Sequence, residues 1–376
     1  MQDTNKRPTI EFSDEQAQLL EVATSFCADK FPVDRARARI AAAEDFDRSV
    51  WLEMASLGWL GVAVPEEFGG SSLGLAEVVT IVEPMGRYLA GTPLTSTTLV
   101  AQALIKAGTD AQKSEWLPAI CEGAIGALAL TEPSGDWNLA NLASKAVRNG
   151  DKLTLSGVKT FVTDAASADL AIVSVALDGA PALVLLDRAA LASAKMERET
   201  VIDETRRSYR VKLDGVTIPA SNLLDPAKTA DCLSHLDLAA CLLLSAEMCG
   251  GASGVIDVTV EYLKTRKQFD KYIGSYQALK HPTVDALLAM EAARSHLYYA
   301  ATVFGKGEEG EIAVRMAKAQ ASDALAFASD RAIQFHGGFG FTYDCDAQLY
   351  RRRGLWCEYQ HGDAAHHRRR LADLLL

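Results

Sequence analysis

The period of the apolar residues changes twice along this chain, and this change limits the folds that it can adopt. Up to about residue 125, apolar residues recur at helical spacing, beginning with a capping-box pattern at Ser13–Gln16. Between residues 126 and 226 the period falls to two, and from 227 to 376 it is helical again. The sequence therefore predicts an α+β protein with three domains, 1–125, 126–226 and 227–376. A doubly wound sheet is excluded because it needs alternating strands and helices.

Turn residues divide these domains into elements. Asn149-Gly150 is typical of a hairpin turn and precedes an alternating run at residues 152–159. Glycines and a proline between residues 58 and 70 exclude a continuous helix there. The further strands that we expect are residues 171–175, 182–186 and 209–213. The expected helices are residues 48–57, 75–89, 96–107, 236–265, 276–303 and 311–335, followed by a short helix at the C-terminus.

The composition of the chain limits the kinds of partner and the cellular location that we expect. Of 376 residues, 49% are hydrophobic, so a sizeable buried core is expected. The 38 Lys and Arg against 49 Asp and Glu give a net charge of −11, which disfavours nucleic acids and anionic membranes. The longest apolar stretch, around residues 238–244, is too short for a membrane span, and the polar opening Met1–Thr4 is not typical of a secretory signal. With seven scattered cysteines and no C-x-x-C pair, a cytoplasmic protein is expected.

Four motifs give the chain a family resemblance. They are GVAVPEEFGG at residues 61–70, LTEP at 130–133, RKQF at 266–269 followed by Gln277, and QFHGGFG at 334–340. In this order and spacing, they make the chain similar to the acyl-CoA dehydrogenases along nearly its whole length. The resemblance implies an N-terminal helical domain, a central β-barrel domain and a C-terminal four-helix bundle.

The resemblance also implies a reaction and its cofactor. FAD accepts a hydride from Cβ of an acyl-CoA while a base removes the Cα proton, and an electron-transferring flavoprotein takes the electrons. The family's usual form is a dimer of dimers, so the resemblance implies a homotetramer, or a heterotetramer with a second acyl-CoA dehydrogenase chain.

One set of residues is assigned by resemblance to the flavin ring. Thr131 and Thr163 would hydrogen-bond it, and Phe161 stands where relatives carry a Trp over the ring. The alternative is that both threonines are ordinary strand residues. The family's Gly-x-Gly-Ser-Asp loop is replaced by a sequence with a bulky Trp137, and Ser134 would substitute for the missing serine.

A second set is assigned by resemblance to the adenine side of FAD. Arg266 fits the pyrophosphate ligand, because a guanidinium binds phosphate oxygens in two contacts, and in relatives it reaches the FAD of a neighbouring subunit. The alternative is a surface arginine beside a glycine turn. The other residues of this set are Gln268, Phe269, Tyr276, Gln277, Gln334, Gly337 and Gly338.

Neither usual position for the catalytic base holds a carboxylate. Counted from the Leu-Tyr-Arg segment that ends at Arg351, one position falls on Gln360, or on His361 with a one-residue insertion. The position that other relatives use falls near Ala240, and Asp237 lies one turn earlier. The sequence thus lacks the family's glutamate.

The carboxylates nearest to the first position are Glu358 and Asp363. The Gly362-Asp363 pair resembles a bacterial branch of the family that acts in steroid side-chain, bile-acid and dicarboxylate breakdown. We therefore predict Asp363 as the base, with the alternative that it caps the last helix, since Asp is a favoured N-cap.

Three other functions stay open. The missing glutamate fits a non-catalytic, FAD-supporting subunit of a heteromeric dehydrogenase, and the same fold also serves flavin oxidases and monooxygenases. A hydrolytic metal site would use residues of the zinc-binding types, namely His361, Asp363, His366 and His367. The acyl group is not specified, and Glu247 is a candidate either for its pocket or for a buried ion pair.

Overall fold

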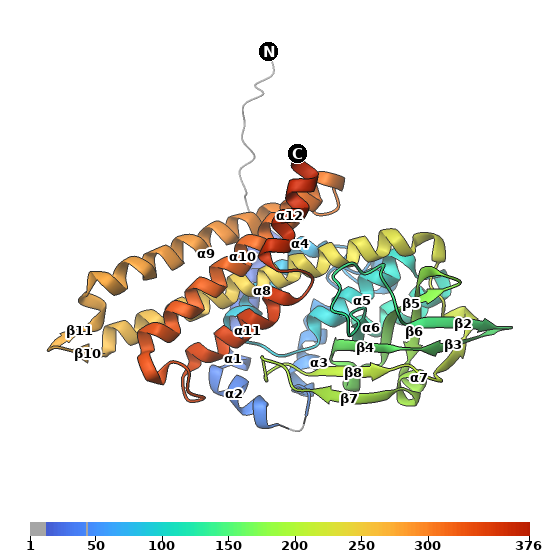
Figure 1. Ribbon diagram of the computed structural model, residues 1–376, viewed down its shortest axis with the longest axis horizontal. Helices are drawn as coiled ribbons and strands as arrows, with labels where there is room; N and C mark the ends of the chain where they lie inside the picture. The colour runs from blue at the N-terminus through green and yellow to red at the C-terminus, as the bar shows by residue number, and fades with distance from the viewer. Residues whose placement is uncertain (1–12, 43) are drawn as a thin grey trace, which may run out of the picture.

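The computed structural model describes residues 13–42 and 44–376, so the polar opening Met1–Thr4 lies outside it. Figure 1 shows helices at both ends of the chain and sheets between them, which confirms the α+β class. The domain boundaries at residues 125 and 226 stay predictions. The helices of the first third are α1 (Asp14–Lys30), α2 (Val33–Ala41), α3 (Arg48–Ser56), α4 (Leu75–Arg87), α5 (Leu94–Ala107) and α6 (Asp110–Cys121).

The first helix begins as predicted. The Ser13 hydroxyl accepts the Gln16 backbone N–H at 3.1 Å, and the Gln16 side-chain carbonyl accepts the Ser13 N–H at 3.2 Å, which completes a capping box. The glycine-rich segment before α4 forms short 3₁₀ turns instead of a helix. A Cβ on Gly70 would lie 2.1 Å from the Val64 carbonyl oxygen, so the backbone crosses itself there and only glycine fits.

Two sheets fill the middle of the chain. The strands are β1 (Gly126–Ala129), β2 (Lys145–Asn149), β3 (Lys152–Ser156), β4 (Val158–Thr163), β5 (Leu170–Leu177), β6 (Ala180–Asp187), β7 (Lys195–Glu199), β8 (Ser208–Lys212) and β9 (Thr217–Pro219). The larger sheet runs β1-β5-β2-β3-β9 with β6 paired to β5, and the smaller one runs β4-β8-β7. Strand β5 pairs in parallel with β1 and β2, while the other pairings are antiparallel.

One sequence prediction in this region needs correction. The Asn149-Gly150 hairpin is confirmed, since Asn149 pairs with Lys152. The alternating run at residues 152–159, however, forms two strands that belong to different sheets. The chain turns at Gly157, where φ is +116° and a Cβ would lie 2.5 Å from the Ser144 hydroxyl oxygen. The period of two continues through the turn, so the pattern alone hides it.

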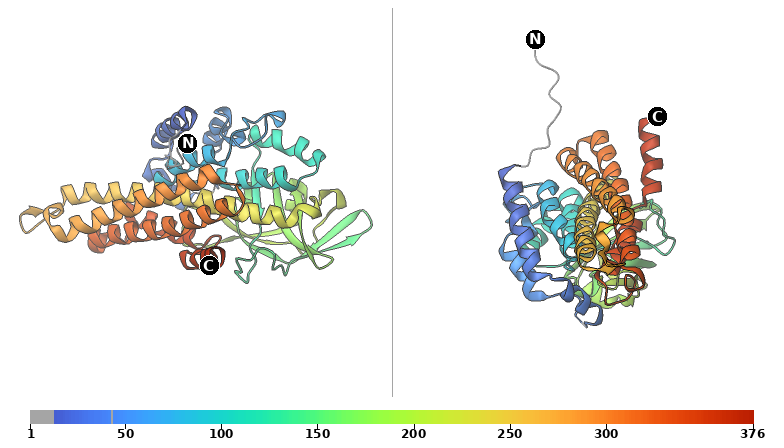
Figure 2. Two further views of the ribbon diagram at one scale, coloured as in Figure 1. Left: turned by 90° about the horizontal axis from the view of Figure 1, so that it is seen from above. Right: turned by 90° about the vertical axis from the view of Figure 1, so that its left-hand side faces the viewer.

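Long helices form the last third of the chain. They are α8 (Thr229–Thr265), α9 (Gln277–Val303), α10 (Gly307–His336), α11 (Asp346–Tyr359) and α12 (Ala364–Leu375), and the hairpin β10 (Lys267–Gln268)–β11 (Lys271–Tyr272) joins α8 to α9. Figure 2 shows α8, α9 and α10 side by side along the long axis of the molecule. With α11 they form the predicted C-terminal bundle.

Helix α4 crosses α8 at very short distance. A Cβ on Gly250 would lie 1.8 Å from the Glu83 carbonyl oxygen, and one on Gly86 would lie 2.1 Å from the Glu247 carbonyl oxygen. The two backbones therefore touch, because neither glycine has a side chain to separate them. This crossing fixes the part of α8 that faces the candidate site.

Helix α8 also has the length and hydropathy of a membrane span. Its apolar window has a mean hydropathy of 1.5, but 94% of that window is buried inside the protein. A helix buried to this extent is a core helix of the bundle.

Candidate active site

A cavity of about 90 Å³ lies where β1 and β4 meet α5, α8 and the end of α11. A cleft of about 420 Å³ adjoins it. The residues that line both spaces are Thr131, Phe161, Trp356, Gln360 and His361. Thr163 lines the cavity but not the cleft. The structure thus brings the flavin-ring residues predicted from the sequence next to the segment in which the base is expected.

Phe161 presents its ring to this space through an unusual backbone. Its φ is +55°, which is rare for a bulky residue, and its N–H donates to a Glu199 carboxylate oxygen at 2.9 Å. The ring is 43% exposed and lies edge-on to Trp356, with centroids 5.9 Å apart. An exposed aromatic face beside the Thr131 and Thr163 hydroxyls suits a planar, hydrogen-bonding ring such as a flavin.

The loop after β1 is shaped by a buried ion pair. Glu132 accepts the backbone N–H groups of Ala143 and Ser144 at 2.6 and 3.0 Å, and the Lys159 ammonium at 2.8 Å. Burial lowers the pKa of Lys159 to about 8, although Glu132 opposes this shift. The glutamate of the LTEP motif therefore holds the loop in place.

One residue of this loop, Ser134, differs in position from the sequence expectation. Ser134 lies in an exposed turn, where its hydroxyl accepts the Asp136 N–H at 3.5 Å, and it lines neither space. Trp137 lines the cleft instead, and its indole N–H donates to the Tyr359 carbonyl at 3.1 Å. The role of Ser134 toward FAD stays a prediction, and the geometry does not support it.

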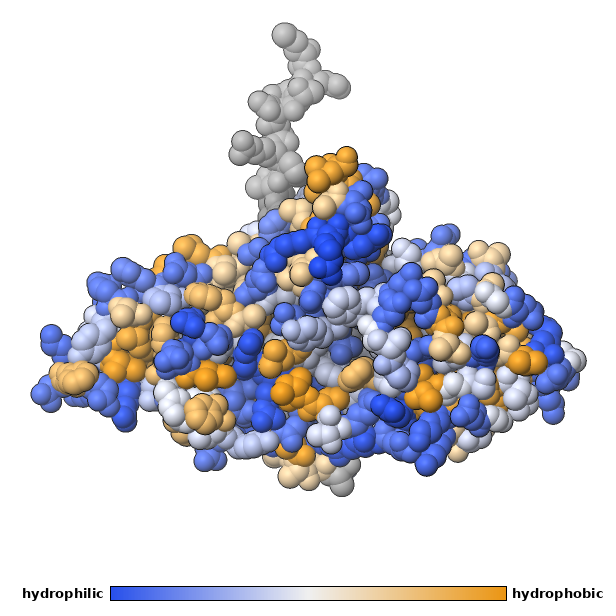
Figure 3. All heavy atoms as spheres, in the orientation of Figure 1, coloured by the Kyte–Doolittle hydropathy of each residue, from blue (hydrophilic) through white to orange (hydrophobic). Residues whose placement is uncertain are grey.

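The residues assigned to the adenine side of FAD lie elsewhere, at the tip of the bundle that points away from the sheets (Figure 1). There a groove of about 930 Å³ is lined by Arg266, Gln268, Phe269, Tyr276, Gln334, Gly337 and Gly338. Gln277 starts α9 beside this groove but does not line it. In Figure 3 hydrophobic residues lie among hydrophilic ones at this end of the molecule.

The groove has the chemistry of a dinucleotide site. Arg266 supplies a guanidinium for phosphate, and Phe269, 87% exposed, supplies an aromatic face. Gly337 has a φ of +65°, and a Cβ built on it or on Gly338 would meet no atom within 4 Å, so the groove wall is open there. These features fit the adenine and pyrophosphate portions of FAD.

Comparison with known proteins decides the family. Models of the acyl-CoA dehydrogenase N-terminal, middle and C-terminal domains match residues 13–124, 127–213 and 240–376. The acyl-CoA dehydrogenase fadE12 of Mycobacterium bovis is 31% identical over 355 residues, which cover 88% of each chain. The chain belongs to the acyl-CoA dehydrogenase family. The predicted family, FAD-dependent acyl-CoA dehydrogenation and cofactor are thereby confirmed.

Solved structures agree with this assignment to the acyl-CoA dehydrogenases. A variant of the steroid acyl-CoA dehydrogenase Tcur3481–Tcur3483 is 31% identical, with a TM-score of 0.85 over 96% of this chain and 97% of the other. Butyryl-CoA dehydrogenase from Megasphaera elsdenii shares the fold, with a TM-score of 0.89 at 24% identity over 98% of this chain and all of the other.

In this acyl-CoA dehydrogenase, the predicted base Asp363 caps a helix. Its carboxylate accepts the His366 N–H at 2.7 Å at the start of α12, and it lines neither the cavity nor the cleft. Gln360 and His361 do line both spaces. Asp363 therefore holds the capping position that the sequence offered as the alternative, and its assignment as base stays a prediction.

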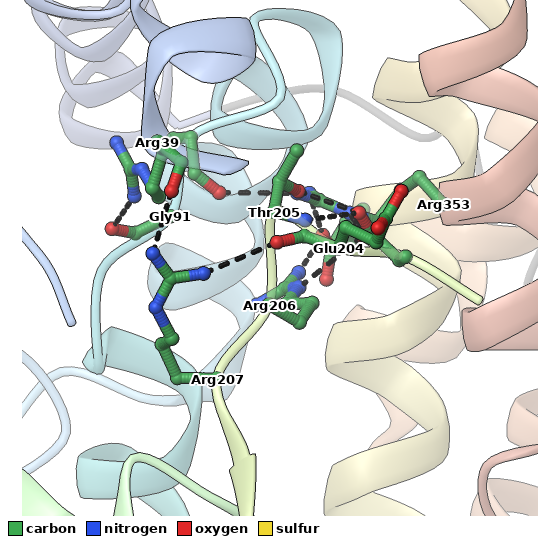
Figure 4. A network of polar contacts seen from close by, with 10 residues as sticks. Arg39, Gly91, Glu204, Thr205, Arg206, Arg207 and Arg353 are labelled. Carbon is green, nitrogen blue, oxygen red and sulfur yellow. Dashed lines mark hydrogen bonds and ion pairs between the residues drawn. The ribbon is translucent and has the colours of Figure 1, made fainter. Parts of the chain in front are cut away.

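Behind the cavity lies a network of arginines and carboxylates that the sequence did not predict (Figure 4). Arg206 lines the cavity and pairs with Glu247, which lines it too. Arg353, fully buried, pairs with Asp203 and donates to Glu247 at 2.6 Å and to Thr205 at 2.8 Å. Glu247 thus both faces the cavity and forms the buried ion pair, so the two alternatives for it are compatible.

The same network extends toward α2. Arg39 donates to the Gly91 carbonyl, and Arg207 donates to the Arg39 carbonyl at 2.6 Å. Burial, together with the charges of Arg353 and Arg207, lowers the pKa of Arg39 to about 10. The network ties the first helices, the sheet region and α11 to one another around the cavity.

The cavity wall is also polar on its β4 side. Burial raises the pKa of Asp164 to about 6, and its carboxylate accepts the Ser96 hydroxyl at 2.8 Å. The Thr92 hydroxyl lines the same cavity, is buried and has no hydrogen-bond partner among the described residues. Such a wall differs from the apolar one that a plain hydrocarbon chain would need.

The residues suggested for a metal site do not form one in this geometry. Within residues 13–42 and 44–376, no three His, Cys, Asp or Glu side chains are grouped as metal ligands would be. His366 packs edge-on against the Trp137 ring, with centroids 5.0 Å apart.

Proposed function

We propose that this acyl-CoA dehydrogenase carries out the reaction in the cavity that Thr131, Phe161, Gln360 and His361 share with the adjoining cleft. The observation that carries this proposal is the convergence of the predicted flavin residues on the predicted base segment. FAD, when bound, supplies the acceptor for the hydride that leaves Cβ. The residues of this chain bind the thioester, exclude water from it and accept the Cα proton.

The chain needs a partner to complete its FAD site. The cleft and the groove at the tip of the bundle have no lining residue in common, so the groove would hold the adenine end of FAD bound in the cleft of another subunit. Exposed apolar residues on α9 support an interface on that helix, namely Val284, Leu287 and Leu288. The partner is a second copy or a related chain in a tetramer. A complex of two different chains, ChsE4–ChsE5 from Mycobacterium tuberculosis, shares this fold with a TM-score of 0.89.

The remaining parts of the proposal follow the family. An electron-transferring flavoprotein takes the electrons, and the cytoplasm is the proposed location. A second candidate function is that of an FAD-supporting subunit without turnover of its own. It is favoured by the absence of a carboxylate at Gln360, His361 and Ala240, which all line the cavity.

The wall of the cavity favours an acyl group that carries a polar atom. The Thr92 hydroxyl is buried there without a hydrogen-bond partner in the described part of the chain, whereas the nearby Arg206 Nε lies 3.9 Å from the Asp203 carboxylate. An unsatisfied buried group costs about 1–3 kcal/mol, which a substrate oxygen would recover. The space of about 90 Å³ favours a short acyl chain, unless the chain extends into the adjoining cleft of about 420 Å³.

Anaerobic titration of the FAD-loaded protein tests the function. We expect short acyl-CoA thioesters with a hydroxyl or carboxylate on the chain to bleach the flavin absorbance, and plain chains of equal length to do so less. The Asp363→Asn variant is titrated alongside. FAD-loaded protein that stays oxidised with every thioester would support the non-catalytic subunit instead.

A further inference from the structure

We propose that the His361 imidazole, oriented by Asp237, is the base that removes the Cα proton. This inference rests on the proposed function and replaces the missing glutamate by a histidine–aspartate pair. It joins His361, on the C-terminal loop, to Asp237, which lies one turn before Ala240 on α8.

The position of His361 fits this role. Its side chain lines both the cavity and the cleft, so it lies at their junction, where the acyl group and the flavin ring meet. Its Nδ1 lies 3.1 Å from the Asp237 carboxylate oxygen. Asp237 belongs to the face of α8 that also supplies Ala240 and Leu244 to the cavity wall, at helical spacing.

Asp237 has the charge that an orienting group needs. Burial by itself would raise its pKa, but the hydrogen bond with His361 and the nearby Arg315 guanidinium lower the pKa below its ordinary value. The Arg315 guanidinium lies 3.7 Å from the second carboxylate oxygen. An ionised Asp237 accepts the Nδ1–H of His361, which leaves the Nε2 lone pair to accept a proton. No group in residues 13–42 or 44–376 hydrogen-bonds that Nε2.

Buried hydrogen-bond donors fix the loop that carries His361. The Lys318 ammonium is fully buried and donates to the carbonyls of Glu358 at 3.0 Å and Gly362 at 2.9 Å, on either side of the histidine. The Cys241 thiol donates to the His361 carbonyl at 3.6 Å. These contacts keep His361 at a φ of +56°, a conformation that non-glycine residues seldom adopt. A base must be fixed in this way to meet one particular proton.

Other groups near the cavity are less suited to the role. Gln360 has no basic atom, and the Asp363 carboxylate caps α12 outside the cavity. Glu247 lines the cavity but is paired with Arg206 and Arg353. Asp164 also lines it and accepts the Ser96 hydroxyl, so it is the one competing carboxylate that the experiment must exclude.

The proposed step balances with the family's reaction. The Cα–H bond breaks and an Nε2–H bond forms on His361, while the electron pair stays on the substrate. That pair forms the Cα–Cβ double bond as the Cβ hydrogen leaves with its own electron pair to FAD. The imidazolium is stabilised by the Asp237 carboxylate, as in other histidine–aspartate pairs.

Deuterium exchange at Cα tests this step without any turnover. The probe is an acyl-CoA with sulfur in place of Cβ, which has no hydride to give up, incubated in D₂O with FAD-loaded protein and analysed by mass spectrometry. We expect exchange to fall about 100-fold or more in His361→Ala, since a positioned base contributes about 10²–10⁴. Asp237→Asn should lower it about 10-fold or more, and His361→Glu should restore part of it.

Controls separate this role from a structural one. The FAD content of each variant should match that of the unsubstituted protein, and thermal unfolding is measured to show that each variant is folded at the temperature of the assay. Asp363→Asn, outside the cavity, should keep exchange within about 3-fold, and Asp164→Asn should lower exchange less than His361→Ala does. Exchange that survives in His361→Ala, that is lost in Asp363→Asn, or that falls as far in Asp164→Asn as in His361→Ala overturns the assignment to His361 but leaves the proposed function intact. Absence of exchange in the FAD-loaded, unsubstituted protein overturns the proposed function together with its base.

Discussion

The Trp137 indole N–H donates to the Tyr359 carbonyl at 3.1 Å, and this contact joins the two loops in which we predict from the sequence that the chain departs from the family's pattern. Trp137 lies in the loop after the LTEP motif, and Tyr359 directly precedes Gln360 and His361. The two departures are therefore coupled in space, although 222 residues separate them in the sequence. The Trp137 indole thus supports the segment that carries Gln360 and His361.

Removing this N–H should affect the reaction more than the stability. Trp137→Phe keeps an aromatic ring but leaves the Tyr359 carbonyl without its donor, which costs only about 1 kcal/mol in the free energy of unfolding. We expect Cα exchange to fall about 10-fold, because a base displaced by about 1 Å loses much of its rate. Trp116→Phe, on α6, is the control and should leave exchange unchanged. Equal effects of both variants would show that the contact has no specific role.

Breaking the buried ion pair of the LTEP motif should unfold the β region at lower denaturant concentration. Glu132→Gln leaves the Lys159 ammonium buried without a counter-charge, so we expect a loss of about 3–5 kcal/mol in urea unfolding. The double variant Glu132→Gln, Lys159→Met removes the charge as well and should recover part of the loss. A double variant less stable than Glu132→Gln would contradict this account.

Stability should depend on pH through Asp164. Burial raises its pKa to about 6 in the folded protein, above the 3.8 of a free side chain, so folding favours the protonated form. Its contribution is complete below about pH 4 and is lost as the pH rises through about 6. Relative to Asp164→Asn, the unsubstituted protein should therefore lose about 2–3 kcal/mol between about pH 4 and about pH 7. Urea unfolding at several pH values measures this difference, and a constant difference would contradict the prediction.

Arg266 should determine how tightly FAD is held. Arg266→Gln removes the groove's guanidinium, and we expect the Kd for FAD to rise about 10-fold or more, since bonds to a charged group contribute about 1.5–3 kcal/mol. Lys264→Gln is the control, because Lys264 is exposed on the same helix end, pairs with Glu261 and does not line the groove. Equilibrium dialysis with FAD gives both values. Equal weakening in the two variants would reflect net charge and not a phosphate contact.

Local patterns allowed much of the fold to be predicted from the sequence. The capping box at Ser13, the hairpin at Asn149 and the long C-terminal helices each depend on residues close together in the chain. Gly157 was missed as a strand boundary because its turn does not interrupt the alternation around it. Asp363 was recognisable as a cap from its place before α12, since that preference is also local.

The site was only partly predictable, for a physical reason. Thr131, Phe161 and Thr163 follow from motifs, and the structure places them together at the cavity and cleft. The pairs Asp237–His361 and Glu247–Arg353 connect residues 124 and 106 positions apart, so no local pattern reports them. Both depend on how α8 packs against the C-terminal segment, which the α4–α8 glycine crossing helps to set.

The FAD site that we propose, with the cleft on one subunit and the groove on another, has a genetic consequence. A chain whose cleft is damaged still offers a sound groove, and a chain whose groove is damaged still offers a sound cleft. When two such defective chains assemble with each other, one of the two composite FAD sites contains both damaged parts and the other contains neither. Two inactive alleles of this gene would therefore complement each other within one assembly.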